Sequence, residues 1–357
     1  MRKYYPATVV SKTATANDAI CIELSVPDEV RADFRYQQGQ HLPVRAVIGK
    51  NDVRRTYSIC SSVGEDTLRI GVRVQPDGIF SNYLADEVQP EGTLEIMPPS
   101  GHFYTELKPD QSKVYAAFVA GSGITPVLSI AKTVLETEAQ SRFVIFYGNR
   151  SRATTMFMED LWALKNQYPA RVSLHFIMSQ EPSEVELYQG RLDGEKVQAL
   201  HAAFLEQSRP DDIFICGPNA MIDAVSDALH SLNYPQEKVH AERFRAILRE
   251  PLPASPRRQE VPADGIEVQV VLDGHRQKFH MKGDEPSILD AAADAGLDLP
   301  YSCKGGVCST CRVKLSKGEV EMAINYSLEP WEVEQGFILT CQSMPLTDSV
   351  ELDYDQA

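Results

Sequence analysis

The chain has 357 residues, which is long enough for two or three domains with their own cores. Its 43% hydrophobic and 24% charged content is that of an ordinary globular protein. The N-terminus, MRKYYPATVV, has no apolar run of signal-peptide length, and no window approaches the ~18 apolar residues of a membrane span. Together with seven cysteines, an odd number in a long chain, this favours a reducing, cytoplasmic location, where paired disulfides are not expected.

The net charge of −15 is unevenly distributed. Residues 263–357 hold 17 acidic and 7 basic side chains, a net charge of −10, whereas the rest of the chain carries −5. An acidic C-terminal part argues against a nucleic-acid partner. Two explanations stay open: the charge only keeps the protein soluble, or an acidic face docks on a basic protein partner.

Short alternating segments with turn signals fill the N-terminal part of the chain. They are ATVVSKT, AICIELSVP, HLPVRAVI, RTYSICSS, LRIGVRVQ and TLEIMPP. This spacing predicts a small antiparallel β-barrel over 1–106. Two short segments stand out within it, RTYS at Arg55–Ser58 and GIFS at Gly78–Ser81.

The following segment, 107–246, predicts an α/β domain with a parallel sheet. KVYAAFVAGSGITPVLSIAKTVLETE is typical of a strand, a glycine turn and a helix, with Thr125 placed to cap the helix and Pro126 in its first turn. Gly121 and Gly123 would let a phosphate approach the helix N-terminus, although Pro126 takes the third glycine's place in a GxGxxG fingerprint. RFVIFYGN and DIFICGP predict further buried parallel strands, each ending in a glycine-containing turn where ligands of such sheets bind.

A proline-rich stretch separates this domain from the C-terminus. RAILREPLPASPRRQEVPADG holds four prolines and few apolar residues in periodic positions. It predicts a semi-rigid linker, which we assign to 247–262.

Residues 263–357 predict an α+β domain. IEVQVVLDGHRQKFHM is typical of two strands joined in a hairpin at Asp273 and Gly274. SILDAAADAG predicts a short helix that Ser287 caps and Gly296 ends.

Four cysteines of this domain have the spacing of a cluster site. Three of them form C-x4-C-x2-C and the fourth lies thirty residues downstream: Cys303, Cys308, Cys311 and Cys341. This is the plant-type [2Fe–2S] pattern, and the glycines of CKGGVC would let backbone N–H groups approach the sulfurs. A zinc site would show two C-x2-C pairs more usually, and inert buried thiols are the remaining alternative. This part resembles plant-type ferredoxins, which have a β-grasp fold, along its whole length.

Nucleotide preference depends on the loop after the second strand of the α/β domain. NAD-selective sites usually place an acidic residue roughly 20 positions beyond the glycines, but there is no Asp or Glu between Ala139 and Met158. YGNRSR instead offers Arg150, Ser151 and Arg152 to a 2′-phosphate. The pattern favours NADPH and leaves NADH as the alternative, with the arginines then being solvated loop charges.

The order of motifs is more specific than any one of them. R-x-Y-S, G-x-x-S, G-x-G-x-T-P and C-G-P resemble the ferredoxin–NADP reductase superfamily. With a ferredoxin at its C-terminus, the whole chain resembles the reductase subunits of bacterial phenylacetyl-CoA 1,2-epoxidase complexes. The segments that carry this closer resemblance are GQH, YGNRS, FICGP, ERF, CKGGVCSTC and NYSLEP.

The resemblance implies roles for individual residues. Arg55 would hold a flavin phosphate, Tyr57 would pack against the isoalloxazine ring, and Ser58 would bond near flavin N5, where the hydride arrives. Ser58, Cys216 and Glu242 would then be the catalytic residues. The other implied cofactor-binding residues are Thr56, Gly78, Phe80, Ser81 and Phe244 for the flavin, and Gly121, Gly123, Thr125, Arg150, Ser151, Cys216, Gly217 and Pro218 for the nucleotide. The flavin is FAD by resemblance, with FMN as the alternative.

Together these modules predict an electron relay from NADPH through FAD and [2Fe–2S] to a protein acceptor. By resemblance, the acceptor is the di-iron oxygenase component of a multisubunit complex that epoxidises phenylacetyl-CoA. The chain has no E-x-x-H, so the oxygen chemistry is expected elsewhere. Three alternatives stay open: a reductase for another oxygenase, such as a Rieske dioxygenase, a redox sensor without turnover, and a subunit with vestigial sites. We expect no nucleic-acid or membrane partner.

Overall fold

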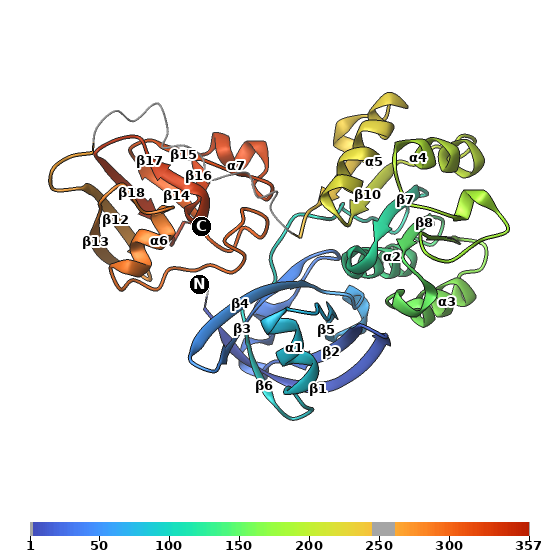
Figure 1. The fold of residues 1–357 in the computed structure, drawn as a ribbon, viewed down its shortest axis with the longest axis horizontal. Coiled ribbons are helices and arrows are strands. Elements are labelled where there is room, and N and C mark those ends of the chain that lie inside the picture. Colours follow the sequence, from blue (N-terminus) through green and yellow to red (C-terminus); the bar gives the residue numbers. More distant parts are fainter. Residues whose placement is uncertain (1–2, 245–260, 357) are drawn as a thin grey trace. The chain divides into compact units, whose positions relative to one another are not determined.

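The computed structural model describes residues 3–244 and 261–356, which fall into two compact units. One unit takes in Tyr4–Val53 and Tyr57–Phe244, so it contains both the predicted barrel and the predicted nucleotide domain. The second unit contains Lys3, Arg54–Thr56 and the described residues from 261 onward (Figure 1). Most of the linker predicted over 247–262 lies outside the described residues.

The barrel prediction is confirmed. Six strands form an antiparallel sheet in the order β4-β3-β6-β1-β2-β5, and an antiparallel bridge between Ile59 and Ile70 joins the chain after β4 to β5. Alternation places one face inward: Ala7 and Val9 are buried, whereas Val10 is exposed. The elements are β1 (Tyr5–Ala16), β2 (Ala19–Ser25), β3 (His41–Ile48), β4 (Asn51–Ser58), β5 (Leu68–Arg73), α1 (Ile79–Asp86) and β6 (Thr93–Ile96).

The parallel sheet predicted for the nucleotide domain is confirmed, and its five strands lie in the order β11-β10-β7-β8-β9. Its central strand β7 is buried on both faces, because Tyr115, Ala117 and Val119 join the core under α2 and α3, and Ala116 and Phe118 join the core under α4 and α5. The elements are β7 (Val114–Ala120), α2 (Ile124–Thr137), β8 (Arg142–Asn149), α3 (Met158–Gln167), β9 (Val172–Met178), α4 (Gly194–Leu200), β10 (Asp212–Cys216), α5 (Asn219–Ser231) and β11 (Val239–Glu242).

The C-terminal unit has a mixed sheet in the order β13-β12-β18-β14-β16 and a separate pair, β15-β17. Its predicted hairpin is confirmed, since Leu272 pairs with His275 across the turn. The predicted cap is also confirmed: the Ser287 hydroxyl accepts a hydrogen bond of 3.2 Å from the Asp290 N–H. The elements are β12 (Ile266–Leu272), β13 (His275–Met281), α6 (Ile288–Asp294), β14 (Arg312–Lys317), β15 (Val320–Met322), α7 (Pro330–Glu334), β16 (Phe337–Leu339), β17 (Ser343–Pro345) and β18 (Ser349–Asp353).

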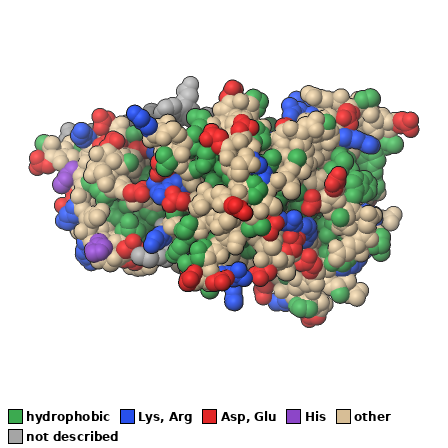
Figure 2. Space-filling view, turned by 90° about the horizontal axis from the view of Figure 1, so that it is seen from below, with side chains coloured by type: hydrophobic (Ala, Val, Ile, Leu, Met, Phe, Trp, Pro, Cys, Tyr) green, Lys and Arg blue, Asp and Glu red, His purple; other side chains and the backbone are tan. Residues whose placement is uncertain are grey.

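Within the described ranges, no helix combines the length and the hydropathy that a bilayer crossing requires. On the face shown in Figure 2, acidic and basic side chains are interspersed among neutral ones.

Candidate functional site

The carboxyl edge of the parallel sheet has a switch point between β7 and β10. From β7 the sheet continues through β8 to one side and through β10 to the other, and ligands of open α/β sheets bind at such a point. The predicted nucleotide residues Gly121 and Gly123 follow β7, and Gly217 and Pro218 follow β10. The fold therefore brings these two separate motifs together at one edge.

The two turns approach each other closely at Gly123. A Cβ atom at this position would lie 2.1 Å from the Cys216 carbonyl oxygen, which is backbone and cannot swing away. Gly121 has a positive φ of 57°, and its carbonyl accepts a 2.8 Å hydrogen bond from the Tyr147 hydroxyl. Both glycines are thus required by the geometry of the turn.

The prediction that Thr125 caps α2 is wrong. The helix begins at Ile124, so Thr125 lies inside the first turn, and Gly123 occupies the capping position. The Thr125 hydroxyl donates a 2.9 Å hydrogen bond back to the Ser122 carbonyl instead of accepting one from the helix. Thr125 is buried, and it holds the turn that precedes the helix.

Arg150 and Ser151 follow β8 at the same edge of the sheet. The exposed Arg150 guanidinium pairs with Asp18, 3.1 Å away, from the turn between β1 and β2. Asp18 also pairs with Arg73 at the end of β5, and Arg73 donates a 2.9 Å hydrogen bond to the Thr154 carbonyl. One carboxylate is therefore shared by two arginines beside the nucleotide turn.

Cys216 and Glu242 lie opposite each other on neighbouring parallel strands, β10 and β11. Burial raises the pKa of the Cys216 thiol well above its usual range, and the nearby Glu242 carboxylate raises it further. Cys216 is therefore a neutral thiol at neutral pH. Glu242 Oε2 is buried and has no hydrogen-bond partner among the described residues.

The other carboxylate oxygen of Glu242 faces a histidine of the barrel. Glu242 Oε1 lies 3.6 Å from His41 Nδ1, and both side chains are nearly buried. His41 Nε2 lies 3.3 Å from the Ser100 hydroxyl. An ionisable pair thus joins β11 of the sheet to β3 of the barrel, next to Cys216.

The predicted flavin residues of the RTYS segment share strand β4. Along it Arg55 is exposed, Thr56 and Tyr57 are half-buried, and Ser58 is buried at the strand end. The Arg55 guanidinium donates a 2.7 Å hydrogen bond to the neighbouring Arg54 carbonyl. The Tyr57 ring lies beside the buried Phe80 ring, with centroids 6.1 Å apart.

GIFS opens helix α1, so a plain hairpin turn at Gly78 is excluded. Ser81 holds the entry to the helix: its hydroxyl accepts a 3.1 Å hydrogen bond from the Gln75 N–H and donates one of 3.1 Å to the Gly78 carbonyl. Phe244 is 38% exposed and ends the described range, so its position over a flavin stays a prediction.

The four predicted cluster cysteines lie in two pairs. The pKa of Cys303 is raised by a hydrogen bond with Cys308 and by burial, and the pKa of Cys341 is lowered by a hydrogen bond with Cys311. Among the described residues, no three Cys, His, Asp or Glu side chains converge as ligands of one metal ion. The Cys308 thiol also raises the pKa of Cys311, so the two pairs are neighbours, as the four cysteine ligands of one cluster would be.

The backbone around the thiols also fits a cluster. The Gly305 N–H donates to the Cys303 sulfur over 3.3 Å. Gly306 has a positive φ of 71°, and a Cβ atom there would lie 2.9 Å from the Ile324 carbonyl oxygen. Cys341 follows the buried strand β16, as predicted, so the strand fixes the position of this predicted distant ligand.

Comparison with protein families gives three matches in chain order. They are the oxidoreductase FAD-binding domain over 6–104, the oxidoreductase NAD-binding domain over 118–227, and the 2Fe-2S iron-sulfur cluster binding domain over 270–346.

Two relatives and one solved structure match nearly the whole chain. A subunit of the 1,2-phenylacetyl-CoA epoxidase from Escherichia coli (strain K12) is 41% identical over 99% of both chains. The ferredoxin reductase component of 3-ketosteroid-9-alpha-monooxygenase from Rhodococcus rhodochrous is 35% identical over 98% of this chain and 95% of the relative. The structure of phthalate dioxygenase reductase covers 98% of each chain with a TM-score of 0.60 and 24% identity, and so shows the same fold.

This chain belongs to the family of reductase components of oxygenases. It is an oxidoreductase of ferredoxin–NADP reductase type with a C-terminal 2Fe–2S domain. The 2Fe–2S prediction is confirmed over zinc, and the predicted FAD-type flavin and nicotinamide-nucleotide domains are confirmed in kind.

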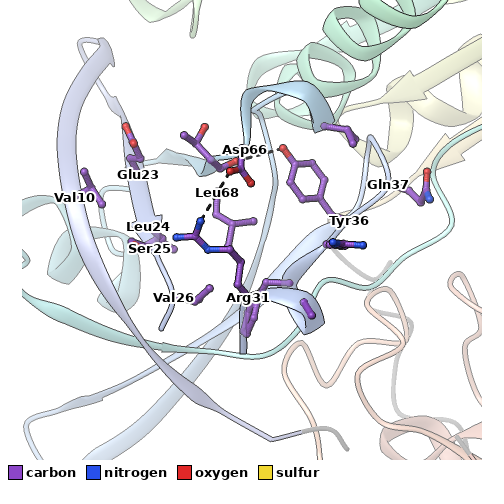
Figure 3. A pocket seen from close by; sticks show the side chains of 15 residues that line it. Val10, Glu23, Leu24, Ser25, Val26, Arg31, Tyr36, Gln37, Asp66 and Leu68 are labelled. Atoms are coloured by element: carbon purple, nitrogen blue, oxygen red, sulfur yellow. Dashed lines mark hydrogen bonds and ion pairs between the residues drawn. The ribbon is translucent and has the colours of Figure 1, made fainter. Parts of the chain in front are cut away.

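A groove in the barrel lies apart from the predicted site residues of this reductase. Its volume is about 860 Å³, and it is lined by β2 and by the segments around Arg31, Tyr36 and Asp66 (Figure 3). The Tyr36 hydroxyl donates a 2.6 Å hydrogen bond to the Ser62 carbonyl, and Arg31 lies 4.0 Å from Asp66. None of the residues predicted to bind flavin, nucleotide or cluster lines this groove.

Sequence reasoning missed three residues of this reductase that lie beside the predicted nucleotide site. The sequence analysis includes His41 only within the GQH segment and assigns it no role, and it assigns none to Asp18 or Arg73. Each belongs to the barrel and reaches the other sheet only in the folded unit. The one local signal is at Arg73, because a charged residue at the end of a predicted strand can indicate a polar contact there.

Proposed function

We propose that this reductase takes electrons from NADPH and delivers them to the di-iron oxygenase that epoxidises phenylacetyl-CoA in a multisubunit complex. The observation that carries this proposal is the 41% identity over 99% of both chains to the epoxidase subunit from Escherichia coli. A bound flavin would accept a hydride and release single electrons, which a [2Fe–2S] cluster passes on. The proposed flavin is FAD, because the matching family model is an FAD-binding one.

The protein's own residues supply position and charge. We assign Arg55, Thr56, Tyr57, Ser58, Gly78, Phe80, Ser81 and Phe244 to the flavin, and Cys303, Cys308, Cys311 and Cys341 to the cluster. The nucleotide pyrophosphate is assigned to the turn at Gly121, Gly123 and Thr125. Cys216, Gly217 and Pro218 would lie beside the nicotinamide, with Ser58, Cys216 and Glu242 as catalytic residues. A cytoplasmic location fits the seven cysteines, which all lie in the described residues and form no disulfide.

Replacing Arg150 by alanine is expected to raise the KM for NADPH by about 10- to 100-fold and to leave the KM for NADH nearly unchanged. The reason is that a hydrogen bond to a charged group contributes about 1.5–3 kcal/mol, and only NADPH has the 2′-phosphate. The matched control is Arg142→Ala, since Arg142 is an exposed arginine at the opposite end of β8. Steady-state kinetics with both nucleotides measures this, and equal losses with both would contradict the NADPH assignment.

Replacing Glu242 by glutamine is expected to slow flavin reduction by NADPH by about 10-fold or more. As the hydride leaves, positive charge develops on the nicotinamide, and a nearly buried carboxylate stabilises it. Stopped-flow loss of flavin absorbance measures the rate, with Glu237→Gln, an exposed glutamate just before β11, as the control. An unchanged rate in Glu242→Gln would remove this residue from the catalytic set.

The proposed partner is tested by reconstitution. The purified reductase is mixed with NADPH, O2, phenylacetyl-CoA and the candidate oxygenase subunits, and the ring epoxide is sought by mass spectrometry. Reduction of cytochrome c is followed alongside. Formation of the epoxide only when this chain is present supports the proposal. Fast cytochrome c reduction without epoxide would show that the chain is an active reductase but that these oxygenase subunits are not its partner.

A reductase of another oxygenase is the second candidate. It is favoured by the 35% identity to the reductase component of 3-ketosteroid-9-alpha-monooxygenase over nearly the full length. Replacing the candidate subunits by another oxygenase in the same assay separates the two functions.

A further inference from the structure

One segment of the C-terminal unit lies directly against the loop that carries three of the four cluster cysteines. The Tyr326 N–H donates a 3.0 Å hydrogen bond to the Gly306 carbonyl, and the Ser309 N–H donates one of 3.1 Å to the Ser327 hydroxyl. Gly306 and Ser309, the two loop residues in these hydrogen bonds, both lie between cluster cysteines in the sequence. A partner that touches this segment therefore reaches the edge of the cluster loop.

The same segment exposes large apolar side chains. Trp331 is 50% exposed, Tyr326 is 39% exposed and Val333 is 40% exposed. Water contact with rings of this size is unfavourable, and Trp and Tyr are the residues that contribute most often to binding energy at protein interfaces. These side chains are not needed for the core of the unit, so their exposure calls for another explanation.

The segment is held in one conformation. The Asn325 side chain accepts a 2.8 Å hydrogen bond from the Leu328 N–H, which fixes the turn before α7. A capping box between Glu329 and Glu332 then fixes the start of α7, and Trp331 lies in its first turn. A preorganised surface loses less entropy on binding a partner.

The charge of the segment has one sign. Residues 318–335 contain five glutamates and no lysine or arginine. Glu332 is buried and pairs with Arg312 at 2.8 Å, whereas Glu329 and Glu334 are exposed. Besides Arg312, Lys314 reaches this segment, and its ammonium group donates a hydrogen bond to the Gln335 carbonyl just beyond the helix. The surface therefore combines apolar rings with a negative rim.

We propose that the surface of Tyr326, Glu329, Trp331 and Glu334, the α7 surface, is where the oxygenase component docks to receive electrons. This inference rests on the proposed function. The occupant is a protein with a basic face, because complementary charge steers association and suppresses partners of like charge.

The alternative occupants fit less well. A second copy of this chain would bring a net charge of −15 against an acidic surface, and the chain outside 263–357 also carries a net negative charge of −5. A small contact centred on one or two rings matches the low-area class of transient electron-transfer contacts, below about 1,200 Å².

The test compares Trp331→Ala with Trp162→Ala. Trp162, on α3, is 47% exposed and belongs to the other unit, so it is a matched control for loss of an exposed tryptophan. In the reconstituted epoxidation, Trp331→Ala is expected to raise the KM for the oxygenase component by about 10-fold or more, while Trp162→Ala leaves it unchanged. Cluster reduction by NADPH, followed by electron paramagnetic resonance, is expected to proceed normally in both variants.

Three outcomes would overturn the docking proposal, and a fourth would overturn the proposed function on which it rests. An unchanged KM in Trp331→Ala rejects the α7 surface as the docking site. Slower cluster reduction in that variant, with the KM unchanged, would indicate that this surface serves electron transfer from the flavin to the cluster within the chain. A wild-type dimer that Trp331→Ala dissociates in sedimentation would assign it to a second copy. A wild-type chain that drives no epoxidation contradicts the proposed function itself, which distinguishes that failure from failure of the docking site.

A second variant tests the charge. Glu329→Gln with Glu334→Gln is expected to raise the same KM several-fold at low salt, and the difference from wild type is expected to vanish at ~1 M salt, where the Debye length is ~3 Å. A KM that matches wild type at low salt would contradict a basic partner.

Discussion

Replacing Cys303 by serine is expected to stop electron delivery to the oxygenase while flavin reduction by NADPH continues. Serine offers no thiolate at neutral pH, so one iron would lose a proposed ligand. Delivery should fall by at least about 100-fold, since even changes beyond the direct ligands of metal sites cost about 10- to 100-fold. The measurements are the visible spectrum of the cluster, stopped-flow flavin reduction and epoxide formation.

The matched control for this experiment is Cys60→Ser. Cys60 is a buried thiol of the barrel whose sulfur donates to the Arg69 carbonyl over 3.3 Å, a hydrogen bond that a serine hydroxyl can also make. This variant should keep both the cluster spectrum and delivery. Unimpaired delivery in Cys303→Ser would contradict the relay.

Replacing Gly123 by alanine is expected to lower both the stability of the protein and its affinity for the nucleotide. The new Cβ atom would lie 2.1 Å from the Cys216 carbonyl, so the turn after β7 or the turn after β10 must shift. Overpacking of this kind costs about 1–3 kcal/mol of stability. Because both turns are assigned to the nucleotide, the KM for NADPH should also rise by about 10-fold or more.

The control for this change is Gly194→Ala at the start of α4. A Cβ atom there would meet only the Ala224 carbonyl oxygen, at an ordinary 3.8 Å. Thermal unfolding and steady-state kinetics of both variants make the comparison. A Gly123→Ala protein with normal stability and normal KM would show that the two turns are not in contact as described.

Much of the fold could be predicted because its signals are local. Alternation of apolar and polar residues predicts the barrel strands, and continuous apolar runs predict the parallel strands β7, β8 and β10. The hairpin at Asp273 and Gly274 and the cap at Ser287 depend on a few neighbouring residues, so sequence alone sufficed. The cysteine spacing is equally local, except for Cys341, which the buried β16 positions.

The residues that were missed depend on long-range contacts. His41 and Glu242 are some 200 positions apart, and Asp18 meets Arg150 across 132 positions. No periodic pattern encodes such a meeting, because it follows from how the barrel and the sheet pack within one unit. Thr125 shows a different limit: the helix begins two residues earlier than the capping pattern indicated, and the Thr125 hydroxyl donates to the preceding turn.

The central claim is that one chain carries electrons from a nicotinamide nucleotide to its own cluster. The most direct measurement is anaerobic mixing of the purified protein with NADPH, with flavin absorbance and the electron paramagnetic resonance of the cluster followed in the same sample. We predict that flavin absorbance falls first and the signal of the reduced cluster then appears without added mediator. Reduced flavin beside a cluster that only dithionite can reduce would contradict the claim.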